Sequence, residues 1–182
     1  MALIRSFVGI SLEVAVAAQI SSALAPIKAA NQEQSIRWVP TENWHVTLAF
    51  LGDQAEETLA RLPENLAASL RDITDFDVSL SCIDMFPDAH SRIVAAWVAP
   101  SPELDLLYQR IYQAVDSMGI AMDTQAFLPH ITLGRIRKGH SALVSAQPMN
   151  SVLRVQQVTL FSSQRTPQGS VYTPMSLVSL TG

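Results

Sequence analysis

A four-residue pattern, His-x-Thr-Leu, occurs twice in this chain, at residues 45–48 and 130–133. In both copies a β-branched residue separates the histidine from the threonine, and apolar residues surround the pair. This composition is typical of a β-strand. Side chains of a strand alternate between its two faces, so residues two apart point the same way. Each copy is therefore expected to present one imidazole and one hydroxyl together on one face of a sheet.

Two imidazoles can divide acid and base chemistry between them. Histidine has a side-chain pKa of about 6.5, so near neutral pH one ring can accept a proton while the other donates one. Cleaving a phosphodiester without a metal needs both, and it also needs donors that stabilise charge on the non-bridging oxygens. Thr47 and Thr132 supply two hydroxyls. A phosphoester-cleaving site built on His45 and His130 is therefore the leading hypothesis.

Arg135 follows the second motif, five residues after His130. Its guanidinium is a candidate for a bidentate contact with phosphate. In an ideal strand Arg135 would point away from His130, and a bulge or the strand end near Gly134 would be needed to bring it round. The other two histidines, His90 and His140, lie in polar turns, and we expect them to be solvated surface residues.

Composition limits the kinds of partner. The chain has 182 residues, 48% of them apolar, which suits one domain or one compact pair of lobes with a sizeable core. The 12 basic and 16 acidic residues give a net charge of −4. That balance argues against a protein that coats long nucleic acid through many phosphate contacts. It leaves room for the capture of one phosphate, because a local field can oppose the net charge.

The order of the expected elements hints at duplication. A strand, a helix and a motif strand come first, and a helix followed by a motif strand recurs, with the two motif histidines 85 positions apart. That spacing suits two similar lobes that face each other. Pro26 is expected to end or bend the first helix. Pro63 is expected either to break the second helix or to start a new helical piece. Three helices are expected, at residues 12–30, 55–73 and 102–118, and Ser11 is the expected cap of the first. The expected strands are 4–10, 37–39, 43–51, 76–85, 92–98, 129–136, 152–162 and 171–180.

The motifs and their surroundings resemble the two-histidine (2H) phosphoesterase superfamily, and within it the RNA 2′,3′-cyclic phosphodiesterases once called 2′-5′ RNA ligases. Residues 38–40 (WVP) with 43–52 (NWHVTLAFLG) are similar to the first signature of that family. Residues 127–135 (FLPHITLGR) are similar to the second. The opening strand at 5–10 and the closing segments 160–163 and 169–172 extend the resemblance over nearly the whole chain.

The resemblance implies an α+β fold over residues 1–182, a single bilobal domain. Each of its two pseudo-symmetric lobes is an antiparallel sheet backed by helices, with the active-site groove between them. It also implies hydrolysis of a terminal 2′,3′-cyclic phosphate to a 2′-phosphate, with no metal and no cofactor. His45 would be the proton donor to the departing 3′ oxygen, and His130 would be the proton acceptor from water. Thr47 and Thr132 would hold the phosphate, and Arg135 would assist.

Three aromatic residues near the motifs carry separate expectations. Phe50 is expected on the same strand face as Thr47, where it either stacks on the terminal nucleoside or is an ordinary core residue. Tyr172 is a weaker candidate for the site. Trp44 is expected to face the core, because it neighbours His45.

Three alternatives stay open. A zinc site would use both histidines, but no carboxylate or cysteine sits at ligand spacing near either one. A non-catalytic module could bind a nucleotide or an RNA end in the same groove. A third alternative is an enzyme that acts on another cyclic phosphate, or that cleaves or joins 2′-5′ linkages. It would use the same phosphate-binding residues. The expected partner is an RNA or oligonucleotide end bearing a 2′,3′-cyclic phosphate. The expected protein is a monomer in the cytoplasm, without a signal peptide or membrane span.

Overall fold

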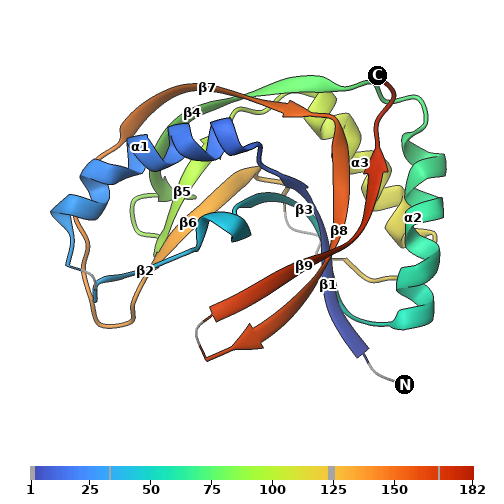
Figure 1. The fold of residues 1–182 in the computed structure, drawn as a ribbon, viewed down its shortest axis with the longest axis horizontal. Coiled ribbons are helices and arrows are strands. Elements are labelled where there is room, and N and C mark those ends of the chain that lie inside the picture. The colour runs from blue at the N-terminus through green and yellow to red at the C-terminus, as the bar shows by residue number, and fades with distance from the viewer. Residues whose placement is uncertain (1–2, 33, 123–125, 168) are drawn as a thin grey trace.

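The computed structural model describes residues 3–32, 34–122, 126–167 and 169–182. Helices and strands mix along the chain (Figure 1). The helices are α1 (Val14–Ala30), the short 3₁₀ helix η1 (Thr41–Asn43), α2 (Glu56–Leu70) and α3 (Pro102–Asp116). The strands are β1 (Leu3–Ser11), β2 (Ile36–Trp38), β3 (His45–Ala55), β4 (Phe76–Phe86), β5 (Ile93–Val98), β6 (His130–Ile136), β7 (Gln147–Val155), β8 (Gln157–Thr166) and β9 (Gly169–Ser179).

The strands form one nine-stranded sheet in the order β7-β4-β5-β6-β3-β1-β8-β9, with β2 paired to β6 outside this path. The pairs between these strands are antiparallel. Each half of the sheet contains one motif strand, and the halves meet where Val46 of β3 lies opposite Ile131 of β6. The expected bilobal α+β arrangement is confirmed, and the sheets of the two lobes are joined at this pair.

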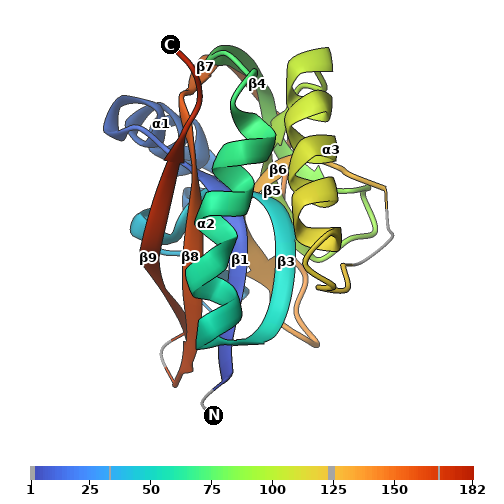
Figure 2. The ribbon, with the colours of Figure 1, turned by 90° about the vertical axis from the view of Figure 1, so that its right-hand side faces the viewer.

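All three helices contribute to one continuous core. The helices α2 and α3 lie side by side (Figure 2), with α2 packed on β9 and β3 and α3 packed on β3, and α1 packs near β7 at the far end of the sheet (Figure 1). Leucines three or four apart face the sheet from α2, as expected for an amphipathic helix. Val46 and Ile131 are fully buried in the same core. The core therefore occupies one face of the motif strands, and the histidines lie on the other face.

Neither proline ends or breaks its helix, so those two expectations are wrong. The helix α1 continues past Pro26, and α2 continues past Pro63. Buried residues follow each proline in the same helix, Ile27 in α1 and Leu66 in α2, so core packing holds the helical course. Ser11 is also not the cap of α1, because it ends β1 and Glu13 occupies the cap position.

The single strand expected at 152–162 is two strands. One is the end of β7, which pairs with β4, and the other is most of β8, which pairs with β1 and β9. Only Gln156 separates them. No glycine or proline marks the boundary between β7 and β8. The strand-like sequence pattern therefore continues without a break where the chain passes from one half of the sheet to the other. No helix in the described part of the chain is long and apolar enough to cross a membrane.

Candidate active site

The two motif strands share one irregularity. The pairing of β3 with β1 skips Leu48, and the pairing of β6 with β5 skips Leu133. The leucine of each motif is thus the extra residue of a β-bulge, which reverses the alternation of faces beyond it. As a result the residue five positions after each histidine, Phe50 or Arg135, returns to the histidine face. The burial patterns of the two strands are the same over seven residues.

This bulge explains two sequence expectations. Arg135 lines the same cleft as Thr132, as the proposed bulge near Gly134 would require. Phe50 shares the face of Thr47 for the same reason, since strict alternation would place a residue three positions later on the opposite face. Trp44 is buried in the core, as expected from its position beside His45.

The register at the junction between the halves brings the motifs together. Val46 and Ile131 are antiparallel partners, and both point into the core. Continuing this register by one residue places the histidine of each motif across from the threonine of the other. The Cβ atoms of such partners are about 5 Å apart. Two imidazoles and two hydroxyls therefore form a compact group on the open face.

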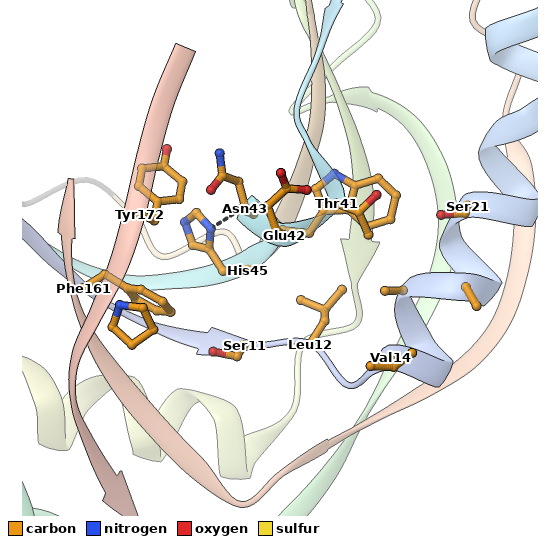
Figure 3. A pocket seen from close by; sticks show the side chains of 14 residues that line it. Ser11, Leu12, Val14, Ser21, Thr41, Glu42, Asn43, His45, Phe161 and Tyr172 are labelled. Atoms are coloured by element: carbon orange, nitrogen blue, oxygen red, sulfur yellow. Dashed lines mark hydrogen bonds between the residues drawn. The ribbon is translucent and has the colours of Figure 1, made fainter. Parts of the chain in front are cut away.

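Backbone carbonyls orient both rings in the same way. The Nδ1 of His45 lies 2.7 Å from the carbonyl oxygen of Asn43 (dashed in Figure 3), and the Nδ1 of His130 lies 2.8 Å from that of Leu128. A carbonyl oxygen only accepts, so each Nδ1 must carry the proton and donate it. This leaves Nε2 of each ring to accept a proton when the ring is neutral, or to donate one when it is charged.

Burial lowers the pKa of both histidines from the ordinary value of 6.5. The bonds to the backbone carbonyls oppose this shift by favouring the charged ring. Positive neighbours add to it, because His130 lowers the pKa of His45 and Arg135 lowers that of His130. Both rings therefore favour the neutral form in the free protein, and a bound anion would favour protonation.

A cleft of about 190 Å³ opens beside this group. Its walls include His45, both motif threonines and Arg135, together with Arg37 from β2. Arg37 is the antiparallel partner of Arg135. Like charges directly opposite each other on neighbouring strands are destabilising, so an anion bound between the two guanidinium groups would stabilise the pair.

His130 lines the adjoining hollow, of about 310 Å³, and not the cleft itself. Its ring stacks on Phe86, with 3.9 Å between ring centroids. Thr47 and Phe50 border both spaces. The two imidazoles thus line two different spaces, with His45 in the cleft and His130 in the adjoining hollow, and Thr47 borders both.

Aromatic rings surround His45. Phe7 lies 4.6 Å from it and Tyr172 lies edge-on at 5.1 Å, measured between ring centroids. The Nδ2 of Asn43 donates to the carbonyl of Ser170 at 2.7 Å, which holds the β8–β9 hairpin beside the first motif. Figure 3 shows a further hollow, of about 620 Å³, on another side of His45, between Glu42, Phe161 and the start of α1.

Sequence reasoning missed Phe7, Arg37 and Asn43. Asn43 lies two residues before His45, and its polar side chain within the signature was an available signal. Nothing in the local sequence indicates that β2 runs beside β6, which is what brings Arg37 to the cleft. Among the residues that the structure describes, no group of three or more histidine, cysteine or carboxylate side chains could hold a metal ion.

A comparison with family models matches this chain twice to the LigT-like phosphoesterases, over residues 10–97 and 98–172. Each match contains one of the two motifs, in agreement with the duplication inferred from their spacing. The chain therefore belongs to the LigT-like phosphoesterase family, as its resemblance to two-histidine phosphoesterases predicted.

Curated relatives and solved structures extend this similarity. An RNA 2′,3′-cyclic phosphodiesterase of Methanothermobacter thermautotrophicus is 26% identical over 185 residues, covering 97% of this chain and 99% of the relative. One from Geobacillus stearothermophilus is 32% identical over 72% of this chain, which spans only 44% of that relative's length. The crystal structure of Escherichia coli LigT complexed with 3′-AMP has a TM-score of 0.80 at 27% identity, with 99% of each chain covered.

Proposed function

We propose that this chain is an RNA 2′,3′-cyclic phosphodiesterase that hydrolyses the terminal cyclic phosphate to a 2′-phosphate without a metal. The observation that carries the proposal is the junction of β3 and β6, where two His–Thr pairs share one open face beside two arginines. The names of the curated relatives and the nucleotide complex of E. coli LigT support the choice of substrate.

In the proposed reaction, water attacks phosphorus while Nε2 of neutral His130 accepts its proton. The bond from phosphorus to the 3′ oxygen breaks, and Nε2 of protonated His45 donates a proton to that oxygen. The phosphate remains on the 2′ oxygen. Each turnover leaves His45 neutral and His130 protonated, and exchange with solvent restores the starting states. The pair needs opposite protonation states on opposite sides of the phosphorus, and the placing of the two rings in adjoining spaces supports this.

The remaining groups would bind the charge and the nucleoside. The hydroxyls of Thr47 and Thr132 would donate to the non-bridging oxygens, and Arg135 would pair with the same phosphate. Phe50 is 62% exposed although it borders the cleft. An exposed aromatic face at that position favours stacking on the terminal nucleoside over a core role. The monomeric state and the location in the cytoplasm remain predictions.

The decisive experiment is product analysis on an oligonucleotide that ends in a 2′,3′-cyclic phosphate. We expect a 2′-phosphate, formed equally well in the presence of a strong chelator. His45→Ala and His130→Ala should each lower kcat by about 10²–10⁴-fold, the usual contribution of an acid or base. His90→Ala is the matched control, because His90 is an exposed histidine of the turn before β5 and should leave kcat unchanged.

Three outcomes would contradict the proposal. Tight binding of the oligonucleotide with no turnover by the wild-type protein would instead identify a binding module. A 3′-phosphate product would reverse the assignment of the departing oxygen, and loss of activity on chelation would favour a metal site.

A further inference from the structure

A second, smaller hollow lies on the other side of Phe50 and Tyr172 from the cleft. It has a volume of about 160 Å³, and Phe50, Ser170 and Tyr172 border both spaces. Arg5 from β1 and Arg165 from β8 stand in its wall. Because Arg5 is two residues before Phe7 in β1, it shares the face on which Phe7 packs against His45. The hollow therefore continues the open face of the motif strands.

The charge around these two spaces is of one sign. Arg37 and Arg135 line the cleft, Arg5 and Arg165 line the second hollow, and no Asp or Glu among the residues that the structure describes lines either one. This is so although the chain carries 16 acidic residues against 12 basic ones. Such a local excess of positive charge concentrates anions. The two spaces together thus offer two sites for negative charge, separated by an exposed aromatic ring.

The arginines of the second hollow are available to an external anion. The ion pairs found among the described residues use other arginines, Arg110 and Arg154. The nearest acidic residue by strand register is Asp53, which is the partner of Arg5 on β3 but is exposed and lies outside the hollow's wall. Arg165 is the partner of Ser170 across the β8–β9 hairpin, so a hydroxyl and not a carboxylate faces it.

We propose that Arg5 and Arg165 bind the phosphate on the 5′ side of the terminal nucleotide. This inference rests on the proposed function. In a nucleotide chain, each nucleoside lies between its 3′ and its 5′ phosphate. With the cyclic phosphate in the cleft and the nucleoside on Phe50, the next phosphate of the chain falls at the second hollow. The site therefore favours oligonucleotide ends over single cyclic nucleotides, which lack that phosphate.

The test compares a nucleoside 2′,3′-cyclic phosphate with a dinucleotide that ends in the same cyclic phosphate. The measured quantity is the ratio of their kcat/KM values. We expect the wild-type protein to prefer the dinucleotide, and the Arg5→Gln/Arg165→Gln double variant to lower the ratio about tenfold, the effect of losing charge-assisted contacts to one phosphate. Arg61→Gln, at an exposed position of α2, is the matched control and should leave the ratio unchanged.

A binding measurement keeps this inference separate from the proposed function. The dinucleotide product with a 2′-phosphate is titrated against both proteins by fluorescence anisotropy at two salt concentrations. We expect the double variant to bind it about tenfold more weakly than wild type and with less dependence on salt. Equal ratios and equal affinities in wild type and double variant would overturn the second phosphate site while leaving hydrolysis intact. If the wild-type protein hydrolyses neither substrate, the proposed function fails, and the titration alone decides whether the arginines bind a phosphate.

Discussion

At the scale of single residues, the two histidines are nearly equivalent. Each donates its Nδ1 proton to a carbonyl two residues earlier in the chain, and burial lowers the pKa of each. The residues at the fifth position after each histidine differ, since one is Phe50 and the other is Arg135. In the proposed reaction this difference would assign the roles, because a nucleoside stacked on Phe50 would direct its departing oxygen to one ring and leave the other for water.

The lowered pKa values predict where the activity is greatest. The active form of the pair carries a single proton, so kcat/KM should follow a bell-shaped profile between two apparent pKa values. Because both rings have a pKa below 6.5 in the free protein, the maximum of kcat/KM should lie below about pH 6.5. The measurement is the rate of hydrolysis of a nucleoside 2′,3′-cyclic phosphate from pH 4.5 to 8.5. A rate that climbs steadily to high pH would rule out the paired acid and base.

At the scale of elements, the bulges are the devices that build the site. In each motif strand the extra leucine of the bulge is buried. Its packing in the hydrophobic core therefore stabilises the bulge. Each bulge places one more side chain on the open face than strict alternation would. This side chain is an aromatic ring in β3 and a guanidinium in β6. Without the bulges, Phe50 and Arg135 would point into the core.

The residue after the second bulge, Gly134, is where β2 approaches most closely. A Cβ atom there would lie 2.7 Å from Cε3 of Trp38 and 2.8 Å from Cγ2 of Ile36. Gly134→Ala should therefore displace β2, which carries Arg37, and lower the free energy of unfolding by about 1–3 kcal/mol. Turnover should fall as well, because Arg37 would move from the cleft. Denaturant unfolding and steady-state kinetics measure the two effects.

Gly182→Ala is the control for this substitution, since a Cβ atom there meets nothing within 4 Å. It should leave stability and turnover unchanged. If Gly134→Ala is as stable as wild type, the close approach of β2 to the second motif strand does not constrain the site.

At the scale of the whole molecule, one core serves both lobes. Buried residues of α1, α2 and α3 pack against the same cluster as Val46 and Ile131. The sheet therefore has a core face covered by helices and an open face that carries the titratable groups. Both histidines are partly withdrawn from water by this architecture, so the proposed acid and base are also groups whose titration affects folding.

That link predicts how stability depends on pH. The folded state lowers the pKa of His45 and His130 below 6.5, so the unfolded chain binds protons more readily. The stability held by the neutral rings is present above pH 6.5 and is lost as the pH falls through 6.5 towards the folded pKa values. Denaturant unfolding at pH 7.5 and 5.5 should show a drop in the free energy of unfolding. The drop should be smaller in a His45→Gln/His130→Gln variant, and an equal drop in both proteins would contradict this origin.

Much of the local structure could be predicted from the sequence, since it depends on neighbours along the chain. The repeated alternation of residues 45–48 and 130–133 indicated two strands with the histidine and threonine on one face. Local patterns failed where distant packing decided the outcome. Pro26 and Pro63 stay inside helices because the core holds the following turn, and 152–162 divides into two strands that pair at different places in the sheet.

The sequence by itself thus determined the chemistry, because an imidazole and a hydroxyl two residues apart in a strand must share a face. Only the tertiary structure decided which groups meet. The burial of Val46 against Ile131 sets the register that joins the motifs, and β2 and the β8–β9 hairpin bring Arg37, Tyr172 and Arg165 to the same face. These contacts join residues far apart in the chain, and their pairing depends on how the whole core packs, which no local pattern of residues encodes.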